Sequence, residues 1–304
     1  MTKLILFIVI SFKVLFADPL FSIIPKLKIE NKDKYNLGKK LFFDQNLSSS
    51  KSVACANCHI FELGGADGNR VSYGVYGKAG IINSPSIFNT KFNIAQDWVG
   101  ECTTVKDRSK MAFLSKIEMA GDVKETLKYI KSNKSLNNLF QKVYNDFNGD
   151  NIFDAIAYYV EHLTTPNSRF DKFLQGDTKA LNENEKKGYR LFKDYGCVSC
   201  HNGVNIGGNL YQKFGIFNKD EIKRDDNLGR YQITKKEYDK YVLKVPSLRN
   251  VSKTAPYMYN GRITKLKDVI KEMGEHQLGI DIPLKDILSI ESFLKTLDGD
   301  IPND

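Results

Sequence analysis

Two short segments of the sequence share one pattern of thiol and imidazole side chains. Residues 55–59 and residues 197–201 each read Cys-X-X-Cys-His and together use four of the five cysteines. This pattern is the attachment signature of c-type haem, in which two thiols bond to one haem and the adjacent imidazole binds its iron. The expected haem-binding residues are Cys55, Cys58, His59, Cys197, Cys200 and His201. The two motifs predict two covalently attached haem c groups.

Cys-X-X-Cys pairs also occur in zinc sites and as redox-active dithiols. Neither of these sites requires a histidine directly after the second cysteine, so haem attachment is the better interpretation. The remaining thiol, Cys102, has no partner within one chain and is expected to be a small buried apolar residue.

The N-terminus indicates export. Lys3 precedes the apolar residues 4–10, Lys13 interrupts the apolar stretch, and Ala17 is a small residue suited to cleavage. The apolar part is shorter than the roughly 20 residues that cross a bilayer. We therefore expect residues 1–17 to be a signal peptide. An uncleaved anchor is the alternative, and both place the body outside the cytoplasm.

Composition indicates a soluble globular protein of two domains. The 304 residues are 41% hydrophobic and 27% charged, and domains usually hold about 100 to 200 residues. The net charge of +9 suits an acidic protein partner, or simply keeps the protein soluble. The sequence has no nucleic-acid-binding motif, so a nucleic-acid partner is not expected.

A sequence pattern typical of a helix precedes each motif. Residues 38–44 and 188–194 are similar and form an internal repeat, and Asn182 with Glu185 predicts a capping box before the second copy. Apolar residues recur at helical spacing from Ile152 to Leu163, and Pro166 then marks a boundary.

Two more helical patterns cover residues 266–273 and 282–297, whereas strand-like alternation is scarce. The last helix is expected to pack against the second haem. We predict a mainly α fold with two cytochrome c-like haem domains and long loops, divided into residues 18–164 and 165–304.

A further motif follows each of the two haem sites. Residues 83–86 read Asn-Ser-Pro-Ser, and residues 245–250 read Val-Pro-Ser-Leu-Arg-Asn. With residues 92–98, 203–208 and 273–279, they make the chain similar to the bacterial di-haem cytochrome c peroxidase family over nearly its whole mature length.

This resemblance implies distinct roles for the two haems. The C-terminal haem is expected to accept electrons, with His201 and Met273 as iron ligands, because a His/Met pair raises the reduction potential. His276 is a weaker candidate for the same position. By itself, Met273 would be read as a core residue.

The N-terminal haem is expected to meet hydrogen peroxide, with His59 as its proximal ligand. Glu118 matches the family's active-site glutamate and can carry a proton between the two peroxide oxygens. Trp98 matches the residue between the haems and is expected to pass electrons. Without the resemblance, Glu118 would be read as a surface group and Trp98 as a packing residue.

The resemblance also implies one calcium ion between the haem domains. The matching ligands are Asn83, Thr254 and Pro256, and an amide oxygen with two backbone carbonyls suits a hard cation.

Three positions depart from the family. Val75 stands where many members have a second histidine that closes the peroxidatic haem, and valine cannot bind iron. A permanently open site is the preferred consequence, and replacement of that histidine by Tyr73 or Tyr76 is the alternative. Arg108 replaces a frequent glutamine and Tyr259 a frequent histidine.

The resemblance therefore implies a periplasmic enzyme that reduces hydrogen peroxide to water with electrons from a small cytochrome c, and one that forms a homodimer. A non-peroxidase electron carrier or redox sensor is the alternative. A maturation enzyme of the type that uses an axial tyrosine is disfavoured by Met273, and His162 is expected only to pack.

Overall fold

The computed structural model describes residues 18–217 and 228–302, so the predicted signal peptide, residues 1–17, lies outside the described residues. The fold is mainly helical, as predicted. The helices are α1 (Lys32–Phe42), α2 (Cys55–Cys58), α3 (Val105–Leu114), α4 (Val123–Ser132), α5 (Lys134–Val143), α6 (Gly149–Glu161), α7 (Arg169–Leu174), α8 (Glu183–Asp194), α9 (Tyr231–Thr234), α10 (Leu266–Glu272) and α11 (Leu284–Leu294). Within the described residues, the strands are β1 (Tyr211–Lys213) and β2 (Val242–Lys244), which pair antiparallel with Tyr211 opposite Lys244. No helix of this part of the chain is long and apolar enough to cross a membrane.

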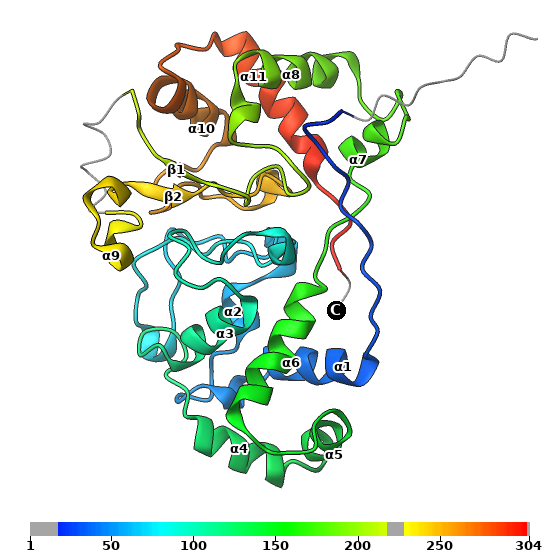
Figure 1. Ribbon diagram of the computed structural model, residues 1–304, viewed down its shortest axis with the longest axis vertical. Helices are drawn as coiled ribbons and strands as arrows, with labels where there is room; N and C mark the ends of the chain where they lie inside the picture. The colour runs from blue at the N-terminus through cyan, green and yellow to red at the C-terminus, as the bar shows by residue number, and fades with distance from the viewer. Residues whose placement is uncertain (1–17, 218–227, 303–304) are drawn as a thin grey trace, which may run out of the picture.

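Buried apolar side chains form two clusters. One cluster draws on residues between Leu37 and Leu163, which include α1 and α6. The other draws on residues between Phe170 and Leu297, which include α8 and α11. Figure 1 shows the two groups of helices at opposite ends of the long axis of the molecule. The boundary between residues 164 and 165 stays a prediction.

Near each end of the described chain, a residue packs against the apolar cluster of the other half. Phe21, which we expected in the first domain, packs in the second cluster. Its segment is held there by hydrogen bonds from Gly203 N to Leu20 O (2.7 Å) and from Ser22 N to Gly203 O (3.5 Å). Ile301 conversely packs against the first cluster. Figure 1 shows the blue segment before α1 passing alongside α7.

Local signals set several helix ends. The predicted capping box of α8 is confirmed, because Asn182 accepts from Glu185 N while Glu185 accepts from Asn182 N. The helix predicted over residues 152–163 is α6, which ends at Glu161, before the predicted boundary. The last helix begins at Leu284 because Pro283 occupies its N-cap.

The internal repeat has a structural counterpart in both halves. A Cβ atom on Gly38 of α1 would lie 2.0 Å from Ala155 O of α6, and one on Gly188 of α8 would lie 1.9 Å from Ser289 O of α11. Only glycine lets the paired helix backbones approach this closely. Four residues after these glycines come two buried phenylalanines, Phe42 and Phe192.

We predict that Gly188→Ala destabilises the second half by about 1 to 3 kcal/mol, because the added methyl group must push α8 away from α11. Urea unfolding of the haem-loaded protein, followed by far-UV circular dichroism, measures this change. Arg190→Ala, at an exposed position of the same helix, is the control and should change the free energy of unfolding by less than about 0.5 kcal/mol. Equal stability of the two variants would contradict the close contact.

Candidate functional site

The first Cys-X-X-Cys-His motif forms a short helix whose last residue leads directly into the histidine. Asn57 accepts a 2.7 Å hydrogen bond from Ala54 N at the start of α2, and His59 N donates to Cys55 O at 3.1 Å. The His59 Nδ1 atom lies 3.0 Å from Gly65 O. A ring held through Nδ1 presents its Nε2 atom as the iron ligand.

The second motif repeats this arrangement in a tighter turn. Residues Cys197–Ser199 form a 3₁₀ turn, and His201 N donates to Cys197 O at 3.0 Å. The ring of Phe192 lies 6.5 Å from that of His201, and the ring of Phe42 lies 6.5 Å from that of His59. The repeat therefore places an equivalent phenylalanine beside each imidazole.

The titration of these residues suits haem ligation. Burial lowers the pKa of His59 and of His201 to about 4 in each case, so both imidazoles are neutral at pH 7, as a metal ligand must be. Burial also raises the pKa of Cys55 to about 12 and that of Cys197 to about 11. These thiols are protonated and apolar, and they suit a pocket for a large apolar ring.

The cysteines are free in the manner that haem attachment requires. All five lie in described residues, and none forms a disulfide. The two thiol pairs, each followed by a neutral histidine, fit two covalently bound haems. Cys102 is buried, as expected for a small apolar residue.

Glu118 lies beside the first motif and forms an ion pair with Arg108 of α3. Arg108 Nη2 is 3.4 Å from both Oε1 and Oε2 of Glu118. The charges of Glu118 and Arg108 both act on the Cys55 and Cys58 thiols. Both side chains are partly exposed, so the pair lies at the surface of the His59 site.

Val75 lies in the segment of residues 73–76, which follows the first motif and contacts Glu118. Its side chain is fully buried, and its backbone N donates to Glu118 O at 2.8 Å. Gly74 touches the same segment, because a Cβ there would lie 2.5 Å from Glu118 O. Tyr73 and Tyr76 instead turn outward, with 58% and 70% of their surface exposed.

Met273 lies where a regular helix changes its geometry. It is the first residue of a π-helix, Met273–Leu278, which continues α10, and π-helical turns frequently occur at functional sites. Gln277 ties this turn to the strand segment, since it accepts from Gly215 N at 3.0 Å and donates to Lys213 O at 3.1 Å.

His276 lies within the same turn but faces another group. Its Nε2 atom is 3.4 Å from Glu272 Oε2, and Glu272 also accepts two hydrogen bonds from Arg262. The other ring nitrogen of His276, Nδ1, is buried and has no hydrogen-bond partner among the described residues.

Trp98 connects the two halves. Its indole Nε1 donates to Asn83 O at 2.9 Å, in the segment after the first motif. Its backbone O accepts from Lys244 N at 2.9 Å, and its ring lies edge-on to Tyr259 with centroids 5.9 Å apart. Lys244 and Tyr259 both follow the second motif, so Trp98 contacts the surroundings of both haem sites.

The predicted calcium ligands lie at the same junction. Asn83 N donates to Tyr259 O, and its Nδ2 donates to Asn69 O, both at 2.9 Å. Within the described residues no donor reaches Asn83 Oδ1 or the backbone oxygens of Thr254 and Pro256. Pro256 also lines a cavity of about 560 Å³. These three oxygens have the chemistry of a hard-cation site.

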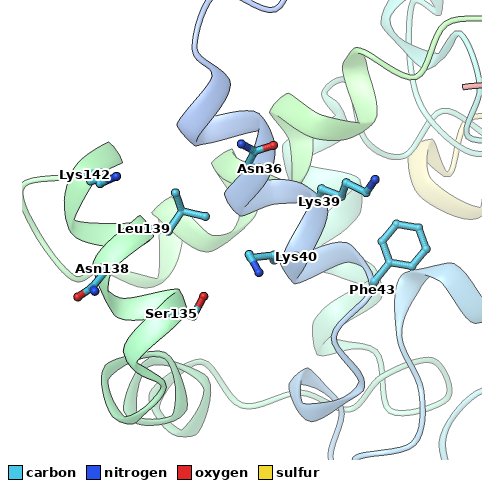
Figure 2. A pocket seen from close by; sticks show the side chains of 8 residues that line it. All are labelled: Asn36, Lys39, Lys40, Phe43, Ser135, Asn138, Leu139 and Lys142. Atoms are coloured by element: carbon cyan, nitrogen blue, oxygen red, sulfur yellow. The ribbon is translucent and has the colours of Figure 1, made fainter. Parts of the chain in front are cut away.

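A separate cavity of about 670 Å³ lies between α1 and α5. Figure 2 shows its lining, which includes Lys39, Lys40 and Lys142 but no acidic side chain. None of the predicted site residues lines it, so it lies outside the candidate site.

Sequence reasoning missed one unusual residue of the junction. Lys244 of β2 is only 7% exposed, and burial lowers its pKa to about 8, against the opposing effect of the Asp97 charge. In the sequence, Lys244 looks like any of the many lysines, and only its place in a strand directly before the Val-Pro-Ser motif distinguishes it.

We predict that Lys244 makes stability rise with pH. Its ordinary pKa is 10.5 and its folded pKa about 8, so between these values the unfolded chain binds more protons and the free energy of unfolding increases with pH. From pH 7.5 to 9.5 the gain should be about 2 kcal/mol relative to Lys244→Met. Urea unfolding of the haem-loaded proteins at both values measures it. Lys253→Met, at an exposed position, should keep the wild-type slope, and equal slopes in wild type and Lys244→Met would contradict the assignment.

Comparisons with known proteins identify the family. A family profile described as "Di-haem cytochrome c peroxidase" matches residues 32–179. Cytochrome c551 peroxidase of Nitrosomonas europaea is 40% identical over 276 residues, which cover 90% of this chain and 82% of that protein. Cytochrome c peroxidase Ccp of Escherichia coli K12 is 41% identical over 281 residues, which cover 91% of this chain and 60% of that longer protein.

The fold is also that of solved structures. A MauG-like protein associated with microbial copper homeostasis superposes with a TM-score of 0.82 at 24% identity, over 91% of this chain and 94% of that one. The diheme peroxidase BthA from Burkholderia thailandensis E264 gives 0.73 at 17% identity, over 92% and 90%. The chain belongs to the di-haem cytochrome c peroxidase family and carries two c-type haems.

Proposed function

We propose that the protein is a peroxidase of the periplasm that reduces hydrogen peroxide to water with electrons from a small cytochrome c. The observation that carries this proposal is the partly exposed Glu118 carboxylate, which pairs with Arg108 and whose backbone O accepts from Val75 N, at the position where many relatives have a histidine ligand. A pure electron carrier needs no acid–base group at this place. The partly exposed pair of Glu118 and Arg108 therefore favours turnover over simple electron transfer or redox sensing.

At the His59 haem, iron supplies the redox chemistry, and the chain supplies proton transfer. Glu118 takes the proton of the peroxide oxygen nearer the iron and gives it to the outer oxygen, which leaves as water. With Val75 in the loop and both tyrosines turned to solvent, no side chain of this loop closes the site. The His59 site would therefore need no prior reduction to admit peroxide, unlike sites of members that keep a histidine there.

His201 and Met273 would hold the second haem, which would accept electrons from the donor, and Trp98 would lie between the two haem sites. The start of a π-helix at Met273 and the family resemblance support the methionine as ligand. The contacts of Trp98 with both halves support the route, since packed atoms and hydrogen bonds connect the two sites there.

A calcium ion held by Asn83, Thr254 and Pro256 would stabilise the junction that Trp98 crosses. Residues 18–164 and 165–304 act as the two haem domains, after export directed by residues 1–17. The homodimer and the donor cytochrome are part of the same proposal, supported by the family. The full sequence has a net charge of +9, of which Lys3 and Lys13 belong to the predicted signal peptide, and the remaining positive charge attracts an acidic partner.

Glu118→Gln should lower peroxide turnover by about 10² to 10⁴-fold, because the amide keeps the shape of the side chain but cannot carry the proton. Steady-state oxidation of a reduced cytochrome c measures this loss. Glu101→Gln, at an exposed position, should leave turnover unchanged. Wild-type turnover in Glu118→Gln, with both haems loaded, would contradict the role of Glu118.

Met273→Leu should lower the reduction potential of the second haem and remove the absorption band typical of methionine-ligated ferric haem. Redox titration followed by absorbance measures both changes. His276→Leu is the matched control on the same turn and should keep the band. The opposite outcome, in which the His276 variant alone shifts the potential, would assign the ligand to His276.

A further inference from the structure

Arg108 has an unusual environment for a charged side chain. It lies in the first turns of α3, and its Nη2 atom reaches both oxygens of Glu118 at 3.4 Å. At this distance each contact is long for a charge-assisted hydrogen bond, which is normally about 2.7 to 2.9 Å. The carboxylate is therefore held loosely and is free to make a second contact.

The other end of the same guanidinium has no partner. Arg108 Nη1 is buried, and no acceptor among the described residues reaches it. A buried N–H group without an acceptor is costly, and the cost is larger for a charged group. Native structures keep few such groups without a reason, so an acceptor that is not part of the polypeptide is expected here.

The position of Arg108 indicates where that acceptor lies. Its Nη2 atom contacts Glu118, and the backbone O of Glu118 accepts a 2.8 Å hydrogen bond from Val75 N in the segment that follows the first Cys-X-X-Cys-His motif. The unpartnered Nη1 atom therefore belongs to the same guanidinium that contacts the proposed acid–base residue.

We propose that Arg108 is a peroxide-binding residue of the His59 site, where its free Nη1–H donates to the outer oxygen of hydrogen peroxide while Nη2 orients Glu118. This inference rests on the proposed function and assigns the site an anion-stabilising group that the frequent glutamine of relatives cannot supply. A guanidinium suits the task because it stays charged and presents several donors in one plane.

The chemistry balances without a proton from arginine. The O–O bond breaks, Glu118 moves one proton from the inner to the outer oxygen, and the outer oxygen leaves as water. Arg108 stabilises the negative charge that develops on that oxygen, as preorganised donors do. Two electrons from the donor cytochrome and two protons from solvent complete the conversion of one peroxide to two waters.

Fluoride binding to the fully oxidised, haem-loaded protein tests the inference without turnover. Fluoride is a small anion that binds open ferric haem and needs a donor beside it. Arg108→Gln should weaken fluoride binding, measured by absorbance titration, by about 10- to 100-fold, the range of one charge-assisted hydrogen bond. Arg108→Lys keeps the positive charge but loses the planar set of N–H donors, so its fluoride affinity should lie between those of the wild type and Arg108→Gln.

Lys110→Gln is the matched control, because it removes one positive charge from an exposed position of the same helix and should leave fluoride affinity unchanged. The kcat/KM for peroxide should fall in parallel with fluoride affinity in the Arg108 variants. The unchanged spectrum of the second haem verifies that each variant is folded.

The outcomes separate this inference from the proposed function. Wild-type turnover with unchanged fluoride affinity in Arg108→Gln and Arg108→Lys overturns the inference alone. The same holds if only the reduction potential of the first haem shifts, because Arg108 would then hold a haem propionate. Fluoride affinity that depends on Arg108 in a wild-type protein without turnover supports the anion site and contradicts the peroxidase.

Discussion

Two close helix contacts set the geometry on which both haem sites depend. Gly38 lets α1 touch α6, and Gly188 lets α8 touch α11, at distances that no larger residue permits. These contacts fix the direction in which each first helix delivers the chain to its Cys-X-X-Cys-His motif. They also bring Phe42 and Phe192 beside the two histidines. The glycine contact and the phenylalanine four residues after it occur in both halves, so the two haem sites have a similar construction.

The two sites then differ in what surrounds the other face of the haem. The second half offers a thioether, Met273, at the start of a π-helix. The first half offers the Glu118 carboxylate, the Arg108 guanidinium and the buried Val75. This difference supports the proposal that electrons enter at one half and that peroxide reacts at the other. Trp98 is the contact between them, since its indole bonds to Asn83 and its ring meets Tyr259.

Sequence reasoning predicted the features that are local. The haem motifs, the capping box of α8 and the mainly helical fold follow from residue types at short spacing. What it missed depends on contacts between distant segments. The position of Phe21 in the second cluster and the burial of Lys244 each depend on segments more than 20 positions away in the chain. The unpartnered Nη1 of Arg108 is a property of the folded site and has no signal in the sequence. The π-helix at Met273 also has no signal in the apolar pattern, because only Met273 and Leu278 of its six residues are apolar.

Electron paramagnetic resonance of the fully oxidised protein, combined with peroxide turnover before and after mild reduction, tests the central claim that the His59 haem is open. A high-spin ferric signal with immediate turnover is the predicted result. It would show that the site formed by Val75, Glu118 and Arg108 needs no activation. Two low-spin haems without turnover in either state would contradict the account and favour an electron carrier or a replacement ligand.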